Sequence, residues 1–262
     1  MQEIFFNKNY QNNNFNIEVL NKKNFTLFKI ENFLDQNTYE FIDKAFPKLD
    51  NEKFKTYDLE KYHNKYTINS TDDYYNKLLD QNTELQLIHD TIFSKKFFNY
   101  FYENLKKFFF LSRSKDLKFF YKLLRPKTLN ISESYIKKLF FTYIRRHIEY
   151  SYIFDGGFVA PHTDSRSKLL SLILFFPEGR DGEKDIGTTF WISDKKNLKN
   201  QHLTNSEDVK KFKENSDVLT KLDFKKCDLF GFIRTSQSWH SVEPFDLGKD
   251  YIRRSIIINF YF

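Results

Sequence analysis

The chain contains a single cysteine, Cys227, and therefore cannot form an internal disulfide. No apolar run approaches the roughly 20 residues that a membrane-spanning helix requires. Residues 1–14, MQEIFFNKNYQNNN, lack the basic and apolar regions of a secretory signal peptide. Because disulfides are rare in the cytosol, these absences together predict a cytoplasmic protein without a membrane segment.

Glycine is also scarce, and its distribution is uneven. The seven glycines all lie between Gly156 and Gly248, and none occurs in the first 155 residues. Glycine supplies the positive φ angles of tight turns and bulges. The distribution therefore predicts a β-rich second half with short turns and a mostly helical first half.

The first half shows helical periodicity. Apolar residues recur at helical spacing over residues 85–92 and 97–108, and Ser94 is placed to cap the second of these helices. Asp35 is placed to cap another helix, which Pro47 would end. A short strand is predicted just before it, at residues 25–30.

From residue 141 onward the pattern changes to short runs of high β-propensity separated by turn residues. Such a succession of short strands is typical of a sandwich or jelly roll. The exception is 194–221, a polar, lysine-rich insertion for which we predict a short helix and either a lid or a surface role. The predicted strands are 141–154, 168–176, 188–193, 227–235, 238–245 and 253–262. We therefore expect a mostly helical part, 1–140, that packs on a β-rich core, 141–262.

The formal net charge of +7 favours anionic ligands. No nucleic-acid-binding pattern accompanies this charge, so we predict no nucleic-acid partner and no membrane partner, and leave the oligomeric state open. A solvated helical face is the simplest interpretation of the main basic cluster, which comprises Lys106, Lys107, Arg113, Lys115, Lys118, Lys122 and Arg125.

Candidate metal ligands stand close together after the Gly156-Gly157 turn. His162 and Asp164 are two residues apart, and in an extended strand residues i and i+2 point to the same face. Both side chains can then reach one metal ion. A lone His-x-Asp is also compatible with an ordinary surface turn.

His240 lies in a later β-type run, Ser-Trp-His-Ser-Val. Two neutral imidazoles and one carboxylate form the facial triad that holds Fe(II) and leaves coordination positions open. A bidentate 2-oxo acid and O2 can take those positions, whereas a structural zinc site closes its coordination sphere with four protein ligands. By itself His240 is equally compatible with a packed core histidine.

Two guanidinium groups, Arg253 and Arg254, open the last strand. A planar, permanently charged guanidinium pairs bidentately with a carboxylate. Because neighbouring strand residues face opposite sides, only one of the two points inward. Arg253 is on the more polar face, which suits a cofactor pocket, but parity alone leaves both arginines open. The Arg253 face carries Ser255, Ile257, Asn259 and Tyr261, and the Arg254 face carries Ile256, Ile258, Phe260 and Phe262.

Taken in order, these motifs resemble the prolyl 4-hydroxylase-like Fe(II)/2-oxoglutarate dioxygenases. The resemblance covers residues 150–262 and extends more loosely to 30–47. It implies an α+β fold whose core is a double-stranded β-helix (a cupin-like jelly roll) with N-terminal helices packed on it. The motifs are His-x-Asp, an aliphatic strand, Gly-Thr-Thr-Phe-Trp at 187–191, Trp-His-Ser-Val at 239–242 and Arg-x-Ser at 253–255.

The resemblance implies that His162, Asp164 and His240 ligate the iron and carry the catalysis, with 2-oxoglutarate and O2 as co-substrates. It selects Arg253, two residues before Ser255, as the partner of the far carboxylate of 2-oxoglutarate. It also assigns co-substrate binding to Tyr152, ten residues before His162, and to the last-strand Ser255. The chain departs from some relatives at 174–176, Leu-Phe-Phe, where a second tyrosine partner would stand.

The implied reaction is hydroxylation, with release of succinate and CO2. A small molecule, an amino acid, a sugar intermediate and a peptidyl residue all remain open as substrates. A cupin-like metal-dependent isomerase and a metal or 2-oxoglutarate sensor without catalysis are the alternatives. An isomerase would not need the late arginine, and a sensor would not release succinate. The other histidines, His63, His89, His147 and His202, lie outside any motif and are not predicted ligands.

Overall fold

The computed structural model describes residues 16–49, 64–113, 126–128, 142–193, 203 and 205–262. The N-terminal residues 1–14, His63, His202 and much of the basic cluster (Lys115, Lys118, Lys122 and Arg125) lie outside the described residues. In the described part, no helix is long and apolar enough to cross a membrane.

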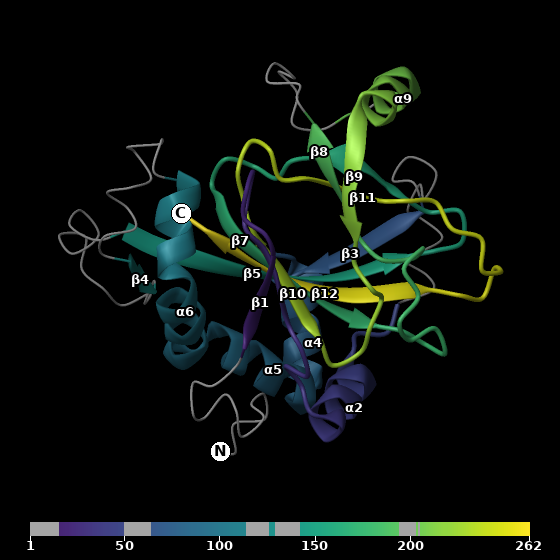
Figure 1. Cartoon of the computed structure of the whole chain (residues 1–262). Coiled ribbons are helices and arrows are strands. Elements are labelled where there is room, and N and C mark those ends of the chain that lie inside the picture. Colours follow the sequence, from purple (N-terminus) through teal and green to yellow (C-terminus); the bar gives the residue numbers. More distant parts are fainter. Residues whose placement is uncertain (1–15, 50–63, 114–125, 129–141, 194–202, 204) are drawn as a thin grey trace.

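The centre of the fold is a large, almost entirely antiparallel sheet (Figure 1) with the strand order β1-β2-β10-β7-β12-β5-β3. A short eighth strand, β4, pairs in parallel with β5. The long strands β5, β7 and β12 pair side by side and form its middle. The strands of this sheet are β1 (Ile17–Asn21), β2 (Leu27–Ile30), β3 (Lys65–Asn69), β4 (Pro126–Thr128), β5 (Thr142–Ile153), β7 (Lys168–Phe176), β10 (Leu229–Ile233) and β12 (Arg253–Tyr261).

A second sheet of four antiparallel strands has the order β6-β11-β8-β9. It consists of β6 (Val159–His162), β8 (Thr189–Ser193), β9 (Ser216–Lys221) and β11 (Trp239–Val242). Apart from β9, which pairs with the preceding β8, the chain alternates between the two sheets from β5 to β12, as expected of a jelly roll.

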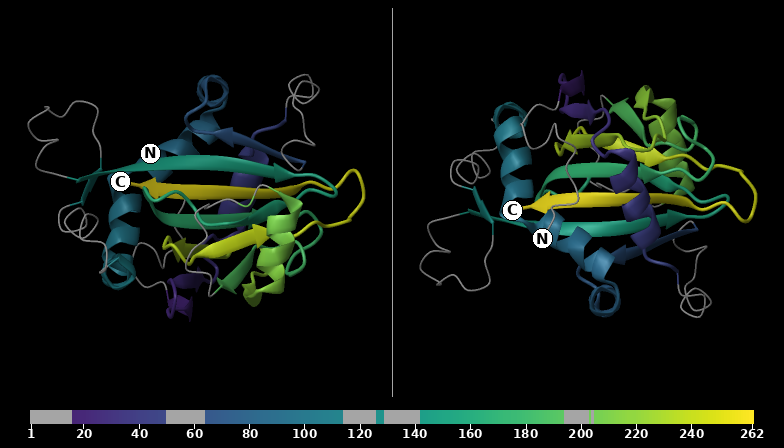
Figure 2. Two further views of the ribbon diagram at one scale, coloured as in Figure 1. Left: turned by 90° about the horizontal axis from the view of Figure 1, so that it is seen from above. Right: turned by 90° about the horizontal axis from the view of Figure 1, so that it is seen from below.

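The helices lie on opposite sides of this pair of sheets. In Figure 1 the helix α9 lies at the top beside β9, whereas α2 and α5 lie at the bottom. Figure 2 shows the long strands β5 and β12 running side by side. The helices are α2 (Gln36–Ala45), α4 (Asp73–Gln81), α5 (Thr83–Phe93), α6 (Lys95–Arg113) and α9 (Ser206–Glu214).

Three apolar cores hold these layers together. The largest lies between the large sheet and helices α2, α4, α5 and α6, and includes Tyr150, Ile256 and Phe97. A second core, with Phe175 and Phe190, lies between the two sheets. A third, in which Phe212 of α9 packs on Trp239, covers the outer face of the small sheet. Alternation along each central strand thus sends one set of side chains to the helices and the other set between the sheets.

Most of the elements predicted from the sequence are confirmed, as is the α+β jelly-roll fold. Asp35 caps α2 by accepting a hydrogen bond from the backbone N–H of Thr38 at 2.7 Å. Ser94 caps α6 by accepting one from the N–H of Phe97 at 3.1 Å. The predicted strand 168–176 is β7 with identical bounds.

Two parts differ from the prediction. The insertion 194–221 holds the predicted short helix, α9, but its last six residues form β9 at the edge of the small sheet. The N-terminal part does more than pack helices on the core, because the predicted strand β2 and two strands that were not predicted, β1 and β3, belong to the large sheet itself. The edge strands β1 and β9 consist of half-buried and exposed residues, and such short edge strands have little apolar signal.

Candidate metal centre

Two neighbouring strands of the small sheet, β6 and β11, bring three potential ligand groups together. His162 ends β6, Asp164 follows it by two residues, and His240 on β11 is the direct antiparallel partner of His162. Candidate ligand atoms of the three side chains all lie within 4.8 Å of one another. The two imidazole rings are 4.2 Å apart between centroids, and His162 Nε2 is 4.0 Å from Asp164 Oδ1. Three donors at these separations can share one metal ion.

The turn before β6 requires glycine. Gly156 has a φ of +70°, which residues with a Cβ rarely adopt. A Cβ at Gly157 would lie 2.5 Å from Ile153 Cγ2 and 2.7 Å from the carbonyl oxygen of Phe154. The Gly-Gly pair therefore lets the chain reverse tightly between β5 and β6, and this turn places His162 opposite His240.

Both histidines are oriented in the same way. The Nδ1 atom of His162 is 3.0 Å from the carbonyl oxygen of Ala160, and the Nδ1 atom of His240 is 3.0 Å from that of Ser238. Since a carbonyl only accepts, each Nδ1 carries the proton, and each Nε2 keeps its lone pair for a metal. Burial lowers the pKa of His240 and so favours the neutral, ligating form.

Asp164 is fixed by a buried lysine. Lys168 Nζ donates to Asp164 Oδ1 at 2.7 Å, and Ser171 Oγ donates to Oδ2 at 3.3 Å. Arg234 Nε donates to the backbone oxygen of Asp164 at 2.8 Å. Burial alone would raise the pKa of the Asp164 carboxyl, but Lys168 and the two imidazoles outweigh burial and hold that pKa well below its usual range. The carboxylate is therefore ionised and pre-positioned as a ligand.

The three ligand groups face a cavity of about 110 Å³ between the two sheets. Its walls come from the inner faces of β5, β7 and β12 on one side and of β6 and β11 on the other. Among the lining residues are Lys65, Glu149, Ser151, Asp164, Lys168, Ser171, Thr188, Phe232, Arg253, Ser255 and Asn259.

Arg253 lies in the wall of the same cavity and is only 2% exposed. Its guanidinium lies between the rings of Phe175 and Phe224, each 5.2 Å away, and its Nε donates to the carbonyl oxygen of Ile186 at 2.5 Å. Burial lowers its pKa to about 10, so it is still charged at neutral pH. No carboxylate of the described residues forms an ion pair with it, and a buried charge without a counter-charge indicates an anion site.

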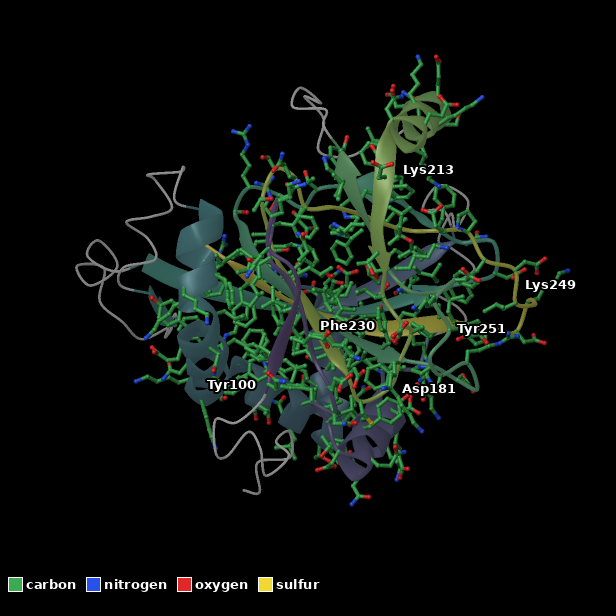
Figure 3. All side chains as sticks on the ribbon, viewed as in Figure 1. Tyr100, Asp181, Lys213, Phe230, Lys249 and Tyr251 are labelled. Carbon is green, nitrogen blue, oxygen red and sulfur yellow. The ribbon has the colours of Figure 1, made fainter. Side chains whose placement is uncertain are left out.

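A second buried polar group, the hydroxyl of Tyr251, lies near Arg253. The hydroxyl of Tyr251 is buried and forms no hydrogen bond within the described part of the chain, and Tyr251 interacts electrostatically with Arg253. Figure 3 shows Tyr251 in the connection between β11 and β12, closer to the sheet than Lys249. Thr188 contributes a further hydroxyl, 3.5 Å from Arg253 Nη2.

Arg254 points the other way. Its Nη2 is 2.9 Å from Asp43 Oδ1 and 3.8 Å from Glu178 Oε2, and its guanidinium lies over Phe46 on the side of the helices. The structure thus shows which of the two arginines faces the cavity, a choice that strand parity alone did not decide. Arg253 reaches the cavity together with Ser255, and Arg254 does not.

The expectation for Tyr152 needs correction. Its side chain is on the helix-facing side of β5, where it packs with Phe46 and donates to the carbonyl oxygen of Pro47. The residues of β5 that line the cavity are Glu149, Ser151 and Ile153. A spacing of ten residues from His162 does not determine which face of β5 a residue occupies, because the Gly-Gly turn interrupts the alternation.

Sequence reasoning missed several polar residues of the cavity. Lys168 and Ser171 contact Asp164 directly, and Lys65, Glu149 and Thr188 line the walls. Lys168 had a detectable signal, since it is a charged residue that opens an otherwise apolar strand. The other residues can be assigned to the cavity only once the order of the strands is known.

No family model and no curated protein matches the chain significantly. Solved structures similar to it include prolyl 4-hydroxylases and another 2-oxoglutarate- and Fe(II)-dependent oxygenase. A prolyl-4-hydroxylase from Pseudomonas putida is 12% identical, with coverage of 90% of this chain and 92% of that chain and a TM-score of 0.42.

A prolyl hydroxylase from Trichoplax adhaerens, solved with a hypoxia inducible factor peptide fragment, is 12% identical over 97% of this chain and 90% of that chain, with a TM-score of 0.46. An oxidoreductase of the 2OG-Fe(II) oxygenase family from Burkholderia pseudomallei is 9% identical over 87% and 79%, with a TM-score of 0.42.

Proposed function

We propose that the protein is an Fe(II)- and 2-oxoglutarate-dependent dioxygenase that hydroxylates its substrate and releases succinate and CO2. The observation that carries this proposal is that a candidate metal site and a candidate anion site share one cavity. A cluster of two imidazoles and one carboxylate faces the same space as a buried guanidinium that has no carboxylate partner among the described residues.

The donor set fits Fe(II). Two nitrogen donors and one carboxylate leave coordination positions for other ligands, whereas a structural zinc site would fill its sphere with protein groups. His162, Asp164 and His240 would hold the iron, and the iron would supply the activation of O2. The hydrogen bonds from Nδ1 to the carbonyl oxygens of Ala160 and Ser238 would leave Nε2 of both imidazoles available to the ion.

The anion site fits the far carboxylate of 2-oxoglutarate. Arg253 would bind that carboxylate as a charged hydrogen-bond donor, and the hydroxyl of Thr188, which lines the same cavity, would assist. The hydroxyl of Tyr251, which interacts electrostatically with Arg253, is a further candidate. Ser255 lines the wall of the same cavity, two residues further along β12. Tyr152 is not part of this site, since its hydroxyl donates to the carbonyl oxygen of Pro47 on the other face of the sheet.

The overall reaction balances without another reductant. One oxygen atom of O2 enters succinate as 2-oxoglutarate loses CO2, and the other atom converts a C–H bond of the substrate into C–OH. The chain contributes binding, orientation and exclusion of water. The apolar side chains of Ile173, Phe232 and Val242 in the cavity wall serve the last of these roles.

The test is anaerobic titration of the full chain with Fe(II) and 2-oxoglutarate, followed by absorption spectroscopy and then by succinate analysis after admission of air. A weak visible absorption band of the chelate, together with succinate release, is expected. A folded protein that shows the band but never releases succinate would be a sensor. A folded protein that shows no band would refute the proposal.

The two arginines offer a matched pair of variants. Arg253→Met is expected to weaken 2-oxoglutarate binding by about 10²-fold, since a charge-assisted pair contributes about 1.5–3 kcal/mol. Arg254→Met is expected to leave the affinity unchanged and to lower only the stability, because Arg254 pairs with Asp43 on the helix side. An equal loss of affinity in the two variants would contradict the assignment of Arg253.

A further inference from the structure

The proposed function accounts for most of the charges in the cavity wall, but not for all. The lining cations are Lys65, Lys168 and Arg253, and the lining carboxylates are Glu149 and Asp164. In the proposed function Asp164, which is paired with Lys168, would ligate the iron, and Arg253 would bind the far carboxylate of 2-oxoglutarate. One ammonium, Lys65, and one carboxylate, Glu149, are left over.

These two residues form an ion pair that crosses the wall. Lys65 lies on β3, the edge strand beside β5 (Figure 2), and its backbone is opposite Ile153. Glu149 is opposite Asn69, which is four residues further along, or about 13 Å of strand. Lys65 Nζ nevertheless lies 2.9 Å from Glu149 Oε1. The two side chains therefore lean toward each other along the strand rather than forming a directly opposed cross-strand pair.

The pair remains accessible. The side chains of Lys65 and Glu149 are 25% and 22% exposed, in contrast to the almost fully buried Arg253. Ion pairs in contact with water contribute little net stability. A ligand that carries both an ammonium and a carboxylate can therefore insert between them at small cost, since each charge exchanges one partner for another of the same sign.

Both charges are close to the metal centre. Lys65 and Glu149 line the same cavity as His162, Asp164 and His240. A ligand held between Lys65 and Glu149 would thus lie next to the metal ligands.

We propose that Lys65 and Glu149 form the substrate subsite and that the substrate is a small zwitterion of the free amino-acid type. Lys65 binds its carboxylate and Glu149 binds its ammonium group. This inference rests on the proposed function, since the bound molecule is the one that is hydroxylated.

A peptide is the main rival. A second cavity of about 470 Å³, lined by Phe158, Pro161, Val209 and Pro244, lies between α9 and the edge of the small sheet and meets the first at Val159 and Val242. A blocked peptide would use that apolar surface and would need neither charge of the Lys65–Glu149 pair. The two substrates therefore predict different responses to the loss of a terminal charge.

The first experiment uses the full chain loaded with Fe(II) and 2-oxoglutarate. Three pools are compared: the twenty free L-amino acids, the same amino acids acetylated on nitrogen, and the same amino acids as C-terminal amides. Only the free pool is expected to shift the chelate absorption anaerobically and to raise succinate release above the level without substrate. Equal responses to all three pools, or a response only to end-blocked peptides, would overturn the inference.

The second experiment uses variants and the amino acid identified by the first. Lys65→Met and Glu149→Gln are each expected to raise its KM about tenfold or more, since each removes one charged contact. Lys221→Met is the matched control, because Lys221 forms an ion pair with Asp185 at 3.1 Å outside the cavity. This control is expected to keep the wild-type KM.

The double variant Lys65→Glu, Glu149→Lys separates recognition from a structural role. It restores an ion pair but reverses its direction relative to the iron. If the pair only stabilised the sheet, the double variant would recover the wild-type KM, and that result would refute the subsite. We expect the KM to stay high while the thermal unfolding midpoint recovers.

The failure of this inference can be distinguished from the failure of the proposed function. If the wild-type chain shows the chelate band and slow succinate release but no response to free amino acids, only the zwitterion subsite is wrong. If the band itself is absent from the folded wild-type chain, the dioxygenase proposal is wrong.

Discussion

At the scale of single residues, the site depends on a buried ion pair. Lys168 and Asp164 are both almost fully buried, and their charged atoms are 2.7 Å apart. Removing only one partner of such a pair costs considerable stability, because the other charge is then buried without a counter-charge. This dependence couples the stability of the fold to the occupancy of the metal centre.

The variant Lys168→Met tests this coupling. In the presence of a chelator it is expected to lower the free energy of unfolding by about 3–5 kcal/mol, since Asp164 loses its counter-charge. With excess Mn(II) the loss is expected to be smaller, because the divalent cation supplies the missing positive charge. Thermal and denaturant unfolding under both conditions measures the difference, with Lys168→Arg as the control that keeps the charge. Equal losses with and without metal would mean that the ion does not bind Asp164.

Tyr251 differs from Lys168 in that its hydroxyl group does not stabilise the ligand-free protein. Its buried hydroxyl has no hydrogen-bond partner in the described structure, so Tyr251→Phe is expected to leave the stability unchanged or slightly higher. If the hydroxyl donates to the far carboxylate of 2-oxoglutarate, the same change weakens that ligand about tenfold. Calorimetric titration with 2-oxoglutarate and a denaturation curve measure the two effects. An unchanged affinity would remove Tyr251 from the anion site.

The sequence predicted the direction of single side chains where the local geometry of one strand is sufficient to determine it. His162 and Asp164 are two residues apart near one strand end, and Arg253 and Arg254 are neighbours on another, so alternation limits where each can point. Tyr152 shows the limit of this reasoning. Its face depends on how β5 pairs with β12 and β3, and no count of residues along the chain contains that information.

At the scale of elements, the connection into β8 is the most tightly packed part of the anion site. A Cβ at Gly187 would lie 1.8 Å from the carbonyl oxygen of Leu222, and Leu222 N–H donates to the Thr188 carbonyl at 2.9 Å. The close approach of these two backbone segments holds Thr188 beside Arg253. Only glycine can stand at this position without moving one of the segments.

Gly187→Ala is therefore expected to lower the free energy of unfolding by about 1–3 kcal/mol, as overpacking does, and also to weaken 2-oxoglutarate binding through displacement of Thr188. Gly179→Ala is the control. A Cβ at Gly179 would meet no atom within 4 Å, but the φ of +72° there costs an L-residue about 1–2 kcal/mol. This control is expected to lower stability with no effect on 2-oxoglutarate. Calorimetric titration of both variants distinguishes them, and an unaltered affinity in Gly187→Ala would contradict the argument.

Elements with strong apolar patterns were predictable, and polar edge strands were not. Every residue of β7 is buried, and its bounds followed from the sequence. By contrast β9 has two exposed residues, Asp217 and Val218, and was interpreted as part of a polar insertion. An edge strand is defined by the neighbour with which it pairs, in this case β8, rather than by its own hydrophobicity.

At the scale of the whole molecule, the large sheet separates two chemical environments. Its inner face carries the charged and hydroxyl groups of the cavity, and its outer face carries a dense aromatic core against the helices. The order of the strands, which puts β12 between β5 and β7, was not predictable from the sequence because each pairing joins distant segments. The alternation within each strand was predictable, and on β12 it places Ile256, Ile258 and Phe260 on the helix side.

The helix side also contains a buried titratable group, remote from the metal centre, that links folding to pH. His89 on α5 contacts the hydroxyl of Tyr75 through Nδ1 at 3.1 Å and stacks on Phe93. Burial lowers its pKa below the ordinary 6.5; Asp90 raises it and Arg146 lowers it, both to a smaller extent. The folded state therefore keeps the neutral imidazole at a pH where the unfolded chain already binds a proton.

The sign of the pH dependence follows from this difference. The contribution of His89 is fully present above the unfolded-state pKa and is lost as the pH falls below it, because protons then bind preferentially to the unfolded chain. The free energy of unfolding is expected to fall between pH 7 and pH 5, with at most about 1.4 kcal/mol per pH unit from this residue. Denaturant unfolding of the wild type and of His89→Gln across this range measures the effect, and the variant is expected to show the shallower slope. Burial also lowers the pKa of His147 and His240, so part of the slope will persist in the variant. An identical slope in the two proteins would mean that His89 titrates alike in the folded and unfolded chain, and that the contact with Tyr75 does not keep it neutral.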